Sequence, residues 1–374
     1  MTKLLPKLPQ GNLKVGEGRI SAYMCFILGL LSFLGVLAFM FPAYLTTPDM
    51  RHAYNPENMR SMMTGGLILA GGFGAFALAK RAERRFAWTG IIFSALAMLL
   101  GGPNVAVGDL TPGAFYIGVD WLIIGFITTA GLFVLLEKCA PLRKDQPVLR
   151  ENWILDMKYF VFYHLTIGFF LFVGNFVVHQ WLDWMQFPIT SAFIESLPFI
   201  AQFLLLILFI DFMQYWIHRV YHENEFFWKV HSVHHSAETM DWLASSRLNI
   251  IEPLITRTLG LIIISTLGFE QGPINAYIIF VGFHATFIHA NFGLNLRWIE
   301  WLLVTPKYHH WHHADAQEAI NTNYAVYVTF LDKLFGTQHN PKEWPEGYGI
   351  VDGHPPEGLF RQQLHPITAK KSKS

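Results

Sequence analysis

The chain has 374 residues, of which 52% are hydrophobic and only 14% are charged, and its formal net charge is zero. A fold that exposes its whole surface to water needs more charge than this, and a neutral chain has no strong attraction to nucleic acid. The two cysteines, Cys25 and Cys139, are far apart and support neither a disulfide framework nor a cysteine metal site. The composition therefore predicts an integral membrane protein without nucleic-acid partners.

Hydrophobic segments near the ~20 residues that cross a bilayer recur along the chain. They predict an all-α membrane fold with about eight transmembrane helices, at 22–45, 62–79, 87–102, 114–136, 159–180, 196–217, 251–268 and 274–292. Residues 1–19 form a polar tail, and the hydrophobic segment after it is long enough to be a retained anchor rather than a cleaved signal peptide.

Basic residues near the ends of spans predict which side each loop lies on, because they resist translocation. The N-terminal tail and residues 80–85 and 138–150 are rich in Lys and Arg, whereas residues 103–113, 181–195 and 269–273 contain none. Both termini are therefore expected in the cytoplasm, with a cytoplasmic helical cap after the sixth span. The membrane would be the plasma or inner membrane of a bacterium or the endoplasmic reticulum of a eukaryote.

The chain divides into two membrane regions and a tail. Residues 20–136 hold four spans and a group of glycines typical of close helix packing, namely Gly65, Gly66, Gly71, Gly72 and Gly74. Residues 155–339 hold the other spans and the chemically interesting motifs. Residues 340–374 are a C-terminal tail rich in Pro and Gly.

Three histidine clusters fall on the predicted cytoplasmic face: HRVYH at 218–222, HSVHH at 231–235 and HHWHH at 309–313. Histidines three or four residues apart share one face of a helix, so they reach a common point. Burying so many imidazoles without an ion would be costly. His284 and His289 lie near the same end of the last span, whereas His310 occupies a spacer position. The pattern predicts a metal site.

Imidazole binds zinc, copper, iron and nickel, so the ligand type alone leaves the metal open. Eight to ten histidines exceed what one ion binds, so two ions are expected. The lack of nearby cysteine argues against a structural zinc site. A nitrogen-rich site for two ions at a membrane surface fits two iron ions that activate O2.

HRVYH, HSVHH and TPKYHHWHH, together with HATFIHANF at 284–292 and NTNYAVYVTFLDKLFGT at 321–337, resemble the fatty acid hydroxylase/sterol desaturase superfamily. The resemblance marks residues 155–339 as a fatty acid hydroxylase-like domain and implies a membrane di-iron enzyme that hydroxylates or desaturates lipids. It implies these metal ligands: His218, His222, His231, His234, His235, His309, His312 and His313, with His284 and His289 as a variable pair. Many relatives have a histidine where this chain has Asn249.

Three polar residues are candidates to support the ligands. Asp211 lies inside the sixth span, where a buried carboxylate is expensive, and we expect it to orient a ligand histidine. Asp315 is either a similar partner or a solvated acid in a loop. Asn249 belongs to the same supporting set.

We expect an O2-dependent oxidoreductase that hydroxylates an unactivated C–H bond of a lipid or sterol-like substrate. No flavin, dinucleotide or haem motif is present in the sequence, so electrons would come from a ferredoxin, or a cytochrome with its reductase. The alternative is a desaturase of a sterol or fatty acyl lipid with the same site. A membrane metal transporter and a zinc hydrolase are less favoured, because the clusters lie on one face and lack an adjacent carboxylate base.

Overall fold

The computed structural model describes residues 16–110, 116–182, 184, 187–351 and 353–369. Most of the predicted N-terminal tail (1–15), the end of the C-terminal tail (370–374) and the start of the fourth predicted span (111–115) lie outside these residues. The described residues form helices and no β-sheet, which confirms the all-α prediction. The chain splits into two compact units, Met1–Trp121 and Leu122–Ser374.

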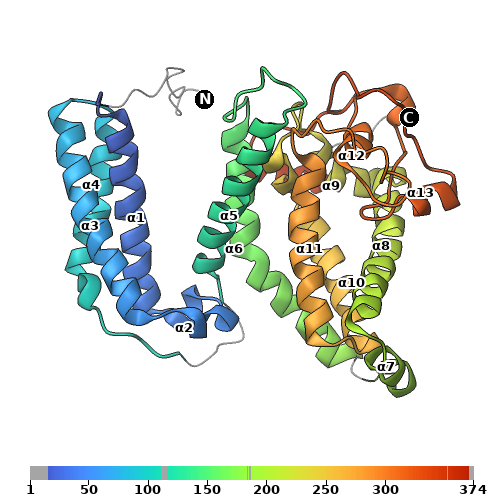
Figure 1. Ribbon diagram of the computed structural model, residues 1–374, viewed down its shortest axis with the longest axis horizontal. Coiled ribbons are helices and arrows are strands. Elements are labelled where there is room, and N and C mark those ends of the chain that lie inside the picture. The colour runs from blue at the N-terminus through green and yellow to red at the C-terminus, as the bar shows by residue number, and fades with distance from the viewer. Residues whose placement is uncertain (1–15, 111–115, 183, 185–186, 352, 370–374) are drawn as a thin grey trace. The chain divides into compact units, whose positions relative to one another are not determined.

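The first unit is a bundle of three long helices that lie side by side (Figure 1). Its elements, in chain order, are α1 (Arg19–Met40), α2 (Pro42–Leu45), the 3-10 helix η1 (Pro48–Ala53), α3 (Pro56–Ala79), α4 (Arg84–Leu99) and the 3-10 helix η2 (Gly102–Asn104). Asn55 caps α3 by accepting hydrogen bonds from the backbone N–H groups of Glu57 and Asn58, and Pro56 occupies its first turn. These two features start the helix six residues before the predicted span.

Close packing in this unit depends partly on glycines that the sequence did not single out. A Cβ atom on Gly90 would lie 2.5 Å from the backbone of Cys25 on α1, so α1 and α4 touch through their main chains. Of the five predicted packing glycines, Gly66 and Gly74 face close neighbours on α1, whereas the other three have open space around them. Small residues therefore set the spacing of these helices at fewer positions than predicted.

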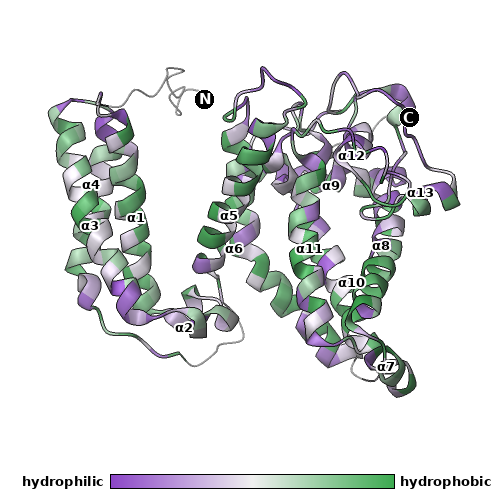
Figure 2. Ribbon diagram, in the orientation of Figure 1, coloured by the Kyte–Doolittle hydropathy of each residue, from purple (hydrophilic) through white to green (hydrophobic). Residues whose placement is uncertain are grey.

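The second unit holds the histidine clusters. Its elements are α5 (Val119–Cys139), α6 (Trp153–Val177), the π-helix η3 (Val178–Leu182), α7 (Pro188–Glu195), α8 (Phe199–Glu223), α9 (Glu225–His235), the 3-10 helix η5 (Trp242–Ser246), α10 (Ile251–Leu267), α11 (Gln271–His289), α12 (Pro306–His312), the 3-10 helix η6 (Gln317–Ala319), α13 (Phe330–Phe335) and α14 (Leu359–Thr368). Figure 2 shows hydrophobic residues along its long helices and hydrophilic residues gathered in its loops and short helices.

The unit boundary lies within α5, earlier than the predicted boundary at residue 136. Phe133 packs in a cluster with Trp242 and Ala290. Glu137 accepts backbone hydrogen bonds from Trp242 at 2.8 Å and from Asn291 at 3.0 Å. These contacts tie the last predicted span of the N-terminal region to the histidine-bearing unit.

Six helical segments are long and apolar enough to cross a membrane: Arg19–Met40, Pro56–Ala79, Arg84–Asn104, Val119–Cys139, Trp153–Trp181 and Phe199–Glu223. They match the first six predicted spans. The last two are the helices α10 and α11, of 17 and 19 residues, which fall short of this combination of length and hydropathy. Glu252 and Arg257 interrupt the apolar character of α10, and Gln271 and Asn275 that of α11.

The main core of the second unit lies between α8, α11, α12 and the segment that leads into α13. It is unusually rich in buried tyrosines, which are Tyr215, Tyr277, Tyr308, Tyr324 and Tyr327. The hydroxyl of Tyr308 donates to the buried carboxylate of Asp332 at 3.0 Å, and this carboxylate also accepts from the backbone N–H groups of Tyr324 and Ala325. The core thus fixes the ends of the helices that carry the histidines.

Candidate metal centre

Four helices deliver the histidine clusters to one place. His218 and His222 lie near the C-terminal end of α8, and α9 begins directly after it because Asn224 breaks the first helix and caps the second. Thr305 caps α12, with Pro306 in its first turn, and this helix carries the third cluster. His289 ends α11.

Nine histidines form two groups whose ring nitrogens lie within 4.8 Å of one another in each group. The first group contains His218, His222, His231, His235 and His312, and the second contains His234, His289, His309 and His313. Each group draws on at least three helices. The rings of His235 and His313 stack with their centroids 4.3 Å apart, so the two groups are neighbours.

Backbone carbonyls determine which ring nitrogen carries the proton in four of these histidines. Nδ1 donates to the carbonyl of Tyr324 in His218 (2.7 Å), of Arg247 in His234 (3.1 Å), of Ala285 in His289 (2.6 Å) and of Thr322 in His312 (2.8 Å). A carbonyl oxygen only accepts, so Nδ1 must hold the hydrogen. The Nε2 atoms of these four neutral rings are therefore bare and available to bind a metal.

The bare Nε2 atoms face one another. His234 and His289 bring theirs to 3.1 Å, and neither has a hydrogen to place between them. The other close pairs of Nε2 atoms span 2.9 to 3.2 Å. Two lone pairs at this distance repel unless a cation lies between them. The donor set and its geometry therefore fit a metal ion in each group.

The spacing also bears on the coordination geometry. Two nitrogens bound to one ion at about 2.1 Å lie about 3 Å apart when they subtend a right angle, and about 3.4 Å apart at the tetrahedral angle. The 2.9 to 3.2 Å separations are nearer the right-angled arrangement. Separations in this range therefore fit pairs of nitrogens that bind one ion.

Burial keeps the imidazoles neutral. Burial, and next to it the neighbouring histidines, lower the pKa well below its usual value in six grouped histidines: His231, His234, His235, His309, His312 and His313. Backbone hydrogen bonds partly oppose this shift in His234 and His312. The neutral ring is the form that binds a metal. Within the two groups, three buried ring nitrogens lack a hydrogen-bond partner among the described residues, namely Nε2 of His222 and Nδ1 of His309 and His313.

His284, the remaining predicted ligand, belongs to neither group. Its Nε2 donates to the carbonyl of Val304 at 3.0 Å, and its ring stacks on Phe280. His284 thus contacts the segment that leads into α12. His310, predicted as a spacer, is fully buried, with Nδ1 2.9 Å from the Tyr348 hydroxyl.

Asp211 supports the site without touching a ligand. Its carboxylate accepts from the backbone N–H groups of Val326, Tyr327 and Val328 at 2.6 to 3.1 Å. The same segment supplies the Tyr324 carbonyl that fixes the ring of His218. Asp211 therefore differs from our expectation of a direct partner, because a carboxylate in the apolar interior gains more from three N–H donors than from one imidazole.

The other two candidates occupy different positions. Asp315 is exposed and lies against the backbone of Gly347. Asn249 is fully buried, and its Nδ2 donates to the carbonyls of Gln362 and Gln363 at 3.2 and 3.0 Å. Asn249 thus holds α14 against the start of α10, at a position where many relatives have histidine.

Sequence reasoning missed a buried ionic network beside the second group. Arg247 donates through Nε to Asp156 at 2.6 Å, and Arg150 donates through NH2 to Asp156 at 2.6 Å and to Asp241 at 2.8 Å. Glu252, 3.1 Å from Nδ1 of His231, was missed as well. These charged residues are far apart in the sequence, and no local pattern links them.

Residues 203–337 match the model of the fatty acid hydroxylase family. The chain is 24% identical over 304 residues to ornithine lipid hydroxylase OlsE of Rhizobium tropici, covering 75% of this chain and 87% of that protein. It is 32% identical over 131 residues to human alkylglycerol monooxygenase, covering 34% of this chain and 28% of that protein.

A very-long-chain aldehyde decarbonylase of Oryza sativa subsp. japonica is 26% identical over 145 residues, which cover 36% of this chain and 22% of the plant protein. The chain therefore spans most of the bacterial relative but less than a third of the other two. No solved structure gives a significant match. The matched region contains all nine grouped histidines, so residues 203–337 are a fatty acid hydroxylase domain by their match to that family's model.

Proposed function

We propose that this protein is an O2-dependent hydroxylase that modifies an unactivated C–H bond of a membrane lipid, with one iron ion held by each histidine group. The observation that carries the proposal is that the Nε2 atoms of both groups approach one another to about 3 Å. Those of His218, His234, His289 and His312 carry no hydrogen, because Nδ1 of each ring donates to a backbone carbonyl. The names of the relatives support lipid hydroxylation as the activity class.

When bound, the two irons would supply the activation of O2 and the removal of hydrogen from the C–H bond. The chain's own residues hold and shield them. The carbonyls of Tyr324, Arg247, Ala285 and Thr322 keep each ligand ring in the tautomer that offers Nε2 to the metal. Most ligand rings are at most 8% exposed, which keeps bulk water away from the ions.

The electrons would come from a separate donor, a ferredoxin or a cytochrome with its reductase. Lys and Arg are concentrated in the loops on the side of the histidines, which favours a cytoplasmic centre with both termini on that side. A soluble donor would then reach the protein from the cytoplasm.

The proposal is tested on purified protein in detergent. Metal analysis should give about two irons per chain, and incubation with lipid extract, reductant and labelled O2 should add one labelled oxygen atom to a lipid. Loss of two hydrogens instead would identify a desaturase. Zinc as the sole metal, with no oxygen-dependent change in any lipid, would refute the oxygenase function.

Variants test the ligands. His312→Ala removes a ligand of the first group and His234→Ala one of the second, so each should lower the iron content and abolish turnover. His354→Ala is the matched control, because His354 is exposed and belongs to neither group. Full iron content and turnover in either ligand variant would contradict the assignment.

A further inference from the structure

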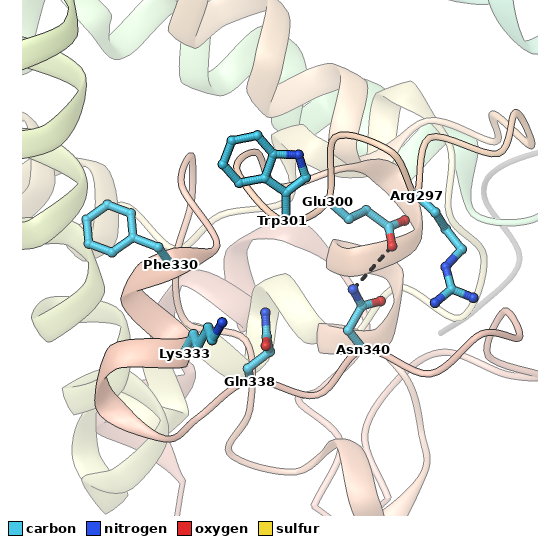
Figure 3. Close-up of a pocket in the computed structure, with 7 residues that line it drawn as sticks. All are labelled: Arg297, Glu300, Trp301, Phe330, Lys333, Gln338 and Asn340. Carbon is cyan, nitrogen blue, oxygen red and sulfur yellow. Dashed lines mark hydrogen bonds between the residues drawn. The ribbon is translucent and has the colours of Figure 1, made fainter.

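A small polar pocket lies next to α12, outside the two histidine groups (Figure 3). Its volume is about 240 Å³, and its lining residues are Arg297, Glu300, Trp301, Phe330, Lys333, Gln338 and Asn340. Pockets for drug-sized ligands measure roughly 300–1,000 Å³. This pocket therefore suits a head group rather than a whole lipid.

The pocket carries an excess of positive charge. Glu300 is 3% exposed and already compensated, because Nζ of Lys307 lies 3.2 Å from its carboxylate. Thr305 and Asn340 donate further hydrogen bonds to it at 3.1 and 3.2 Å. Arg297 and Lys333, in contrast, have no carboxylate within ion-pairing distance among the residues that the structure describes.

Amide groups and aromatic rings complete the lining. Gln338 and Asn340 provide hydrogen-bonding groups, and Figure 3 shows them across the pocket from Trp301. Phosphate and carboxylate oxygens are the partners that guanidinium, ammonium and amide N–H groups bind best. The donor set therefore fits an anion.

The rim of the pocket is apolar and exposed. Trp301 and Phe330 line the pocket and are 72% and 39% exposed. Trp298 and Leu334, which follow the lining residues Arg297 and Lys333 in the sequence, are 72% and 65% exposed. Tryptophan beside basic residues is typical of the membrane–water interface, where the ring lies among lipid head groups and the cation pairs with phosphate. Such a rim favours a lipid over a free anion, because it offers the acyl chains a surface next to the charged pocket.

We propose that this pocket binds the anionic head group, phosphate or carboxylate, of a membrane lipid whose chains lie over Trp301 and Phe330. The site is linked to the metal centre through one helix, since Glu300 accepts from Thr305, the cap of α12. His309 follows four residues later, about 6 Å along the helix axis. A lipid held here lies close to the helix that carries His309, His312 and His313.

The test is a lipid titration of the full-length protein followed by native mass spectrometry. The probes are dioleoyl phosphatidylglycerol and dioleoyl phosphatidylcholine, which share acyl chains and differ in net charge. Wild-type protein should bind the anionic lipid more tightly. Arg297→Gln with Lys333→Gln should weaken this binding roughly thirtyfold, since each cation near a membrane surface contributes about a fivefold gain.

The control is Lys144→Gln with Arg361→Gln, which removes the same charge at two exposed positions elsewhere in this unit. It should leave the preference intact. An equal loss in both double variants, or no preference for the anionic lipid, would overturn the site. Displacement of the lipid by millimolar inorganic phosphate alone would show a free-anion site and refute the lipid assignment.

The single variants Arg297→Gln and Lys333→Gln guard against misfolding of the double variant, and each should weaken binding about fivefold. The iron content of every variant is measured in the same samples. The assay measures lipid binding and involves no turnover. Its result therefore stays valid even if the proposed hydroxylase function is wrong.

Discussion

Replacement of Asp156 by alanine is the sharpest test of how the second histidine group is held. Asp156 is fully buried and accepts from both Arg150 and Arg247 at 2.6 Å. Arg150 keeps Asp241 as a partner at 2.8 Å, but Arg247 loses the one carboxylate that it pairs with among the described residues. Arg247 then retains hydrogen bonds to the backbone and hydroxyl oxygens of Ser236.

Removing one partner of a buried ion pair costs about 3–5 kcal/mol, because a charge is left uncompensated. For a unit of this size, each kcal/mol corresponds to roughly 2–4 °C in Tm. Asp156→Ala should therefore lower Tm by about 6–20 °C. The carbonyl of Arg247 fixes the ring of His234, so the variant should also bind metal about 10- to 100-fold more weakly in the second group.

The assay combines a thermal melt with metal analysis after dialysis against a weak chelator. We expect the iron content of Asp156→Ala to fall to about half of the wild-type value, because the first group does not depend on this network. Asp145→Ala, at an exposed carboxylate, is the control. Adding Arg247→Met to Asp156→Ala should recover part of the lost Tm by removing the uncompensated charge. An unchanged Tm and iron content would refute the reasoning.

Three further predictions concern other parts of the fold. Asn249→Ala should release α14, because two buried hydrogen bonds to the carbonyls of Gln362 and Gln363 are lost. Limited proteolysis should then cut the chain before residue 359. An uncut chain would argue against this contact. Burial lowers the pKa of His310 from 6.5 to about 3. Between these two pH values the unfolded chain binds a proton at His310 that the folded chain does not bind. Stability is therefore fully present above about pH 6.5 and lost as the pH falls toward 3, and the Tm of His310→Asn should depend less on acid than that of the wild type. Gly90→Val should destabilise the first unit by more than about 1–3 kcal/mol, because the new side chain clashes with the backbone of α1. The iron content should stay unchanged, because the histidine groups lie in the second unit. A loss of iron would contradict the independence of the two units.

The sequence determined most of the secondary structure and the nature of the site. Long apolar segments predicted the first six spans, because a bilayer forces every backbone group to bond within its own helix. Spacings of four residues identified His218/His222, His231/His235 and His309/His313, each of which stays within one group. The three-residue pairs His231/His234 and His309/His312 are instead divided between the groups. The number of histidines predicted two ions. The glycine pattern was less informative, since Gly90 was missed and a Cβ atom on Gly65 would meet no neighbour within 4 Å.

Only the tertiary structure decided which histidines act together. Members of one cluster divide between the groups, as His234 and His235 do, because neighbouring residues on a helix point in different directions. Packing of α11 and α12 brings His289 to His234 and leaves His284 facing the carbonyl of Val304. Such pairings depend on side-chain directions between distant segments, which no local pattern encodes.

The supporting residues show the same division. The sequence marked Asp211 as important because a carboxylate inside a membrane helix is expensive, and this holds. Its partners, the N–H groups of 326–328, became visible only when that segment was placed against α8. Residue type and spacing specify what chemistry a site needs, whereas long-range packing specifies which atoms meet, because tertiary contacts join residues more than a hundred positions apart in the chain.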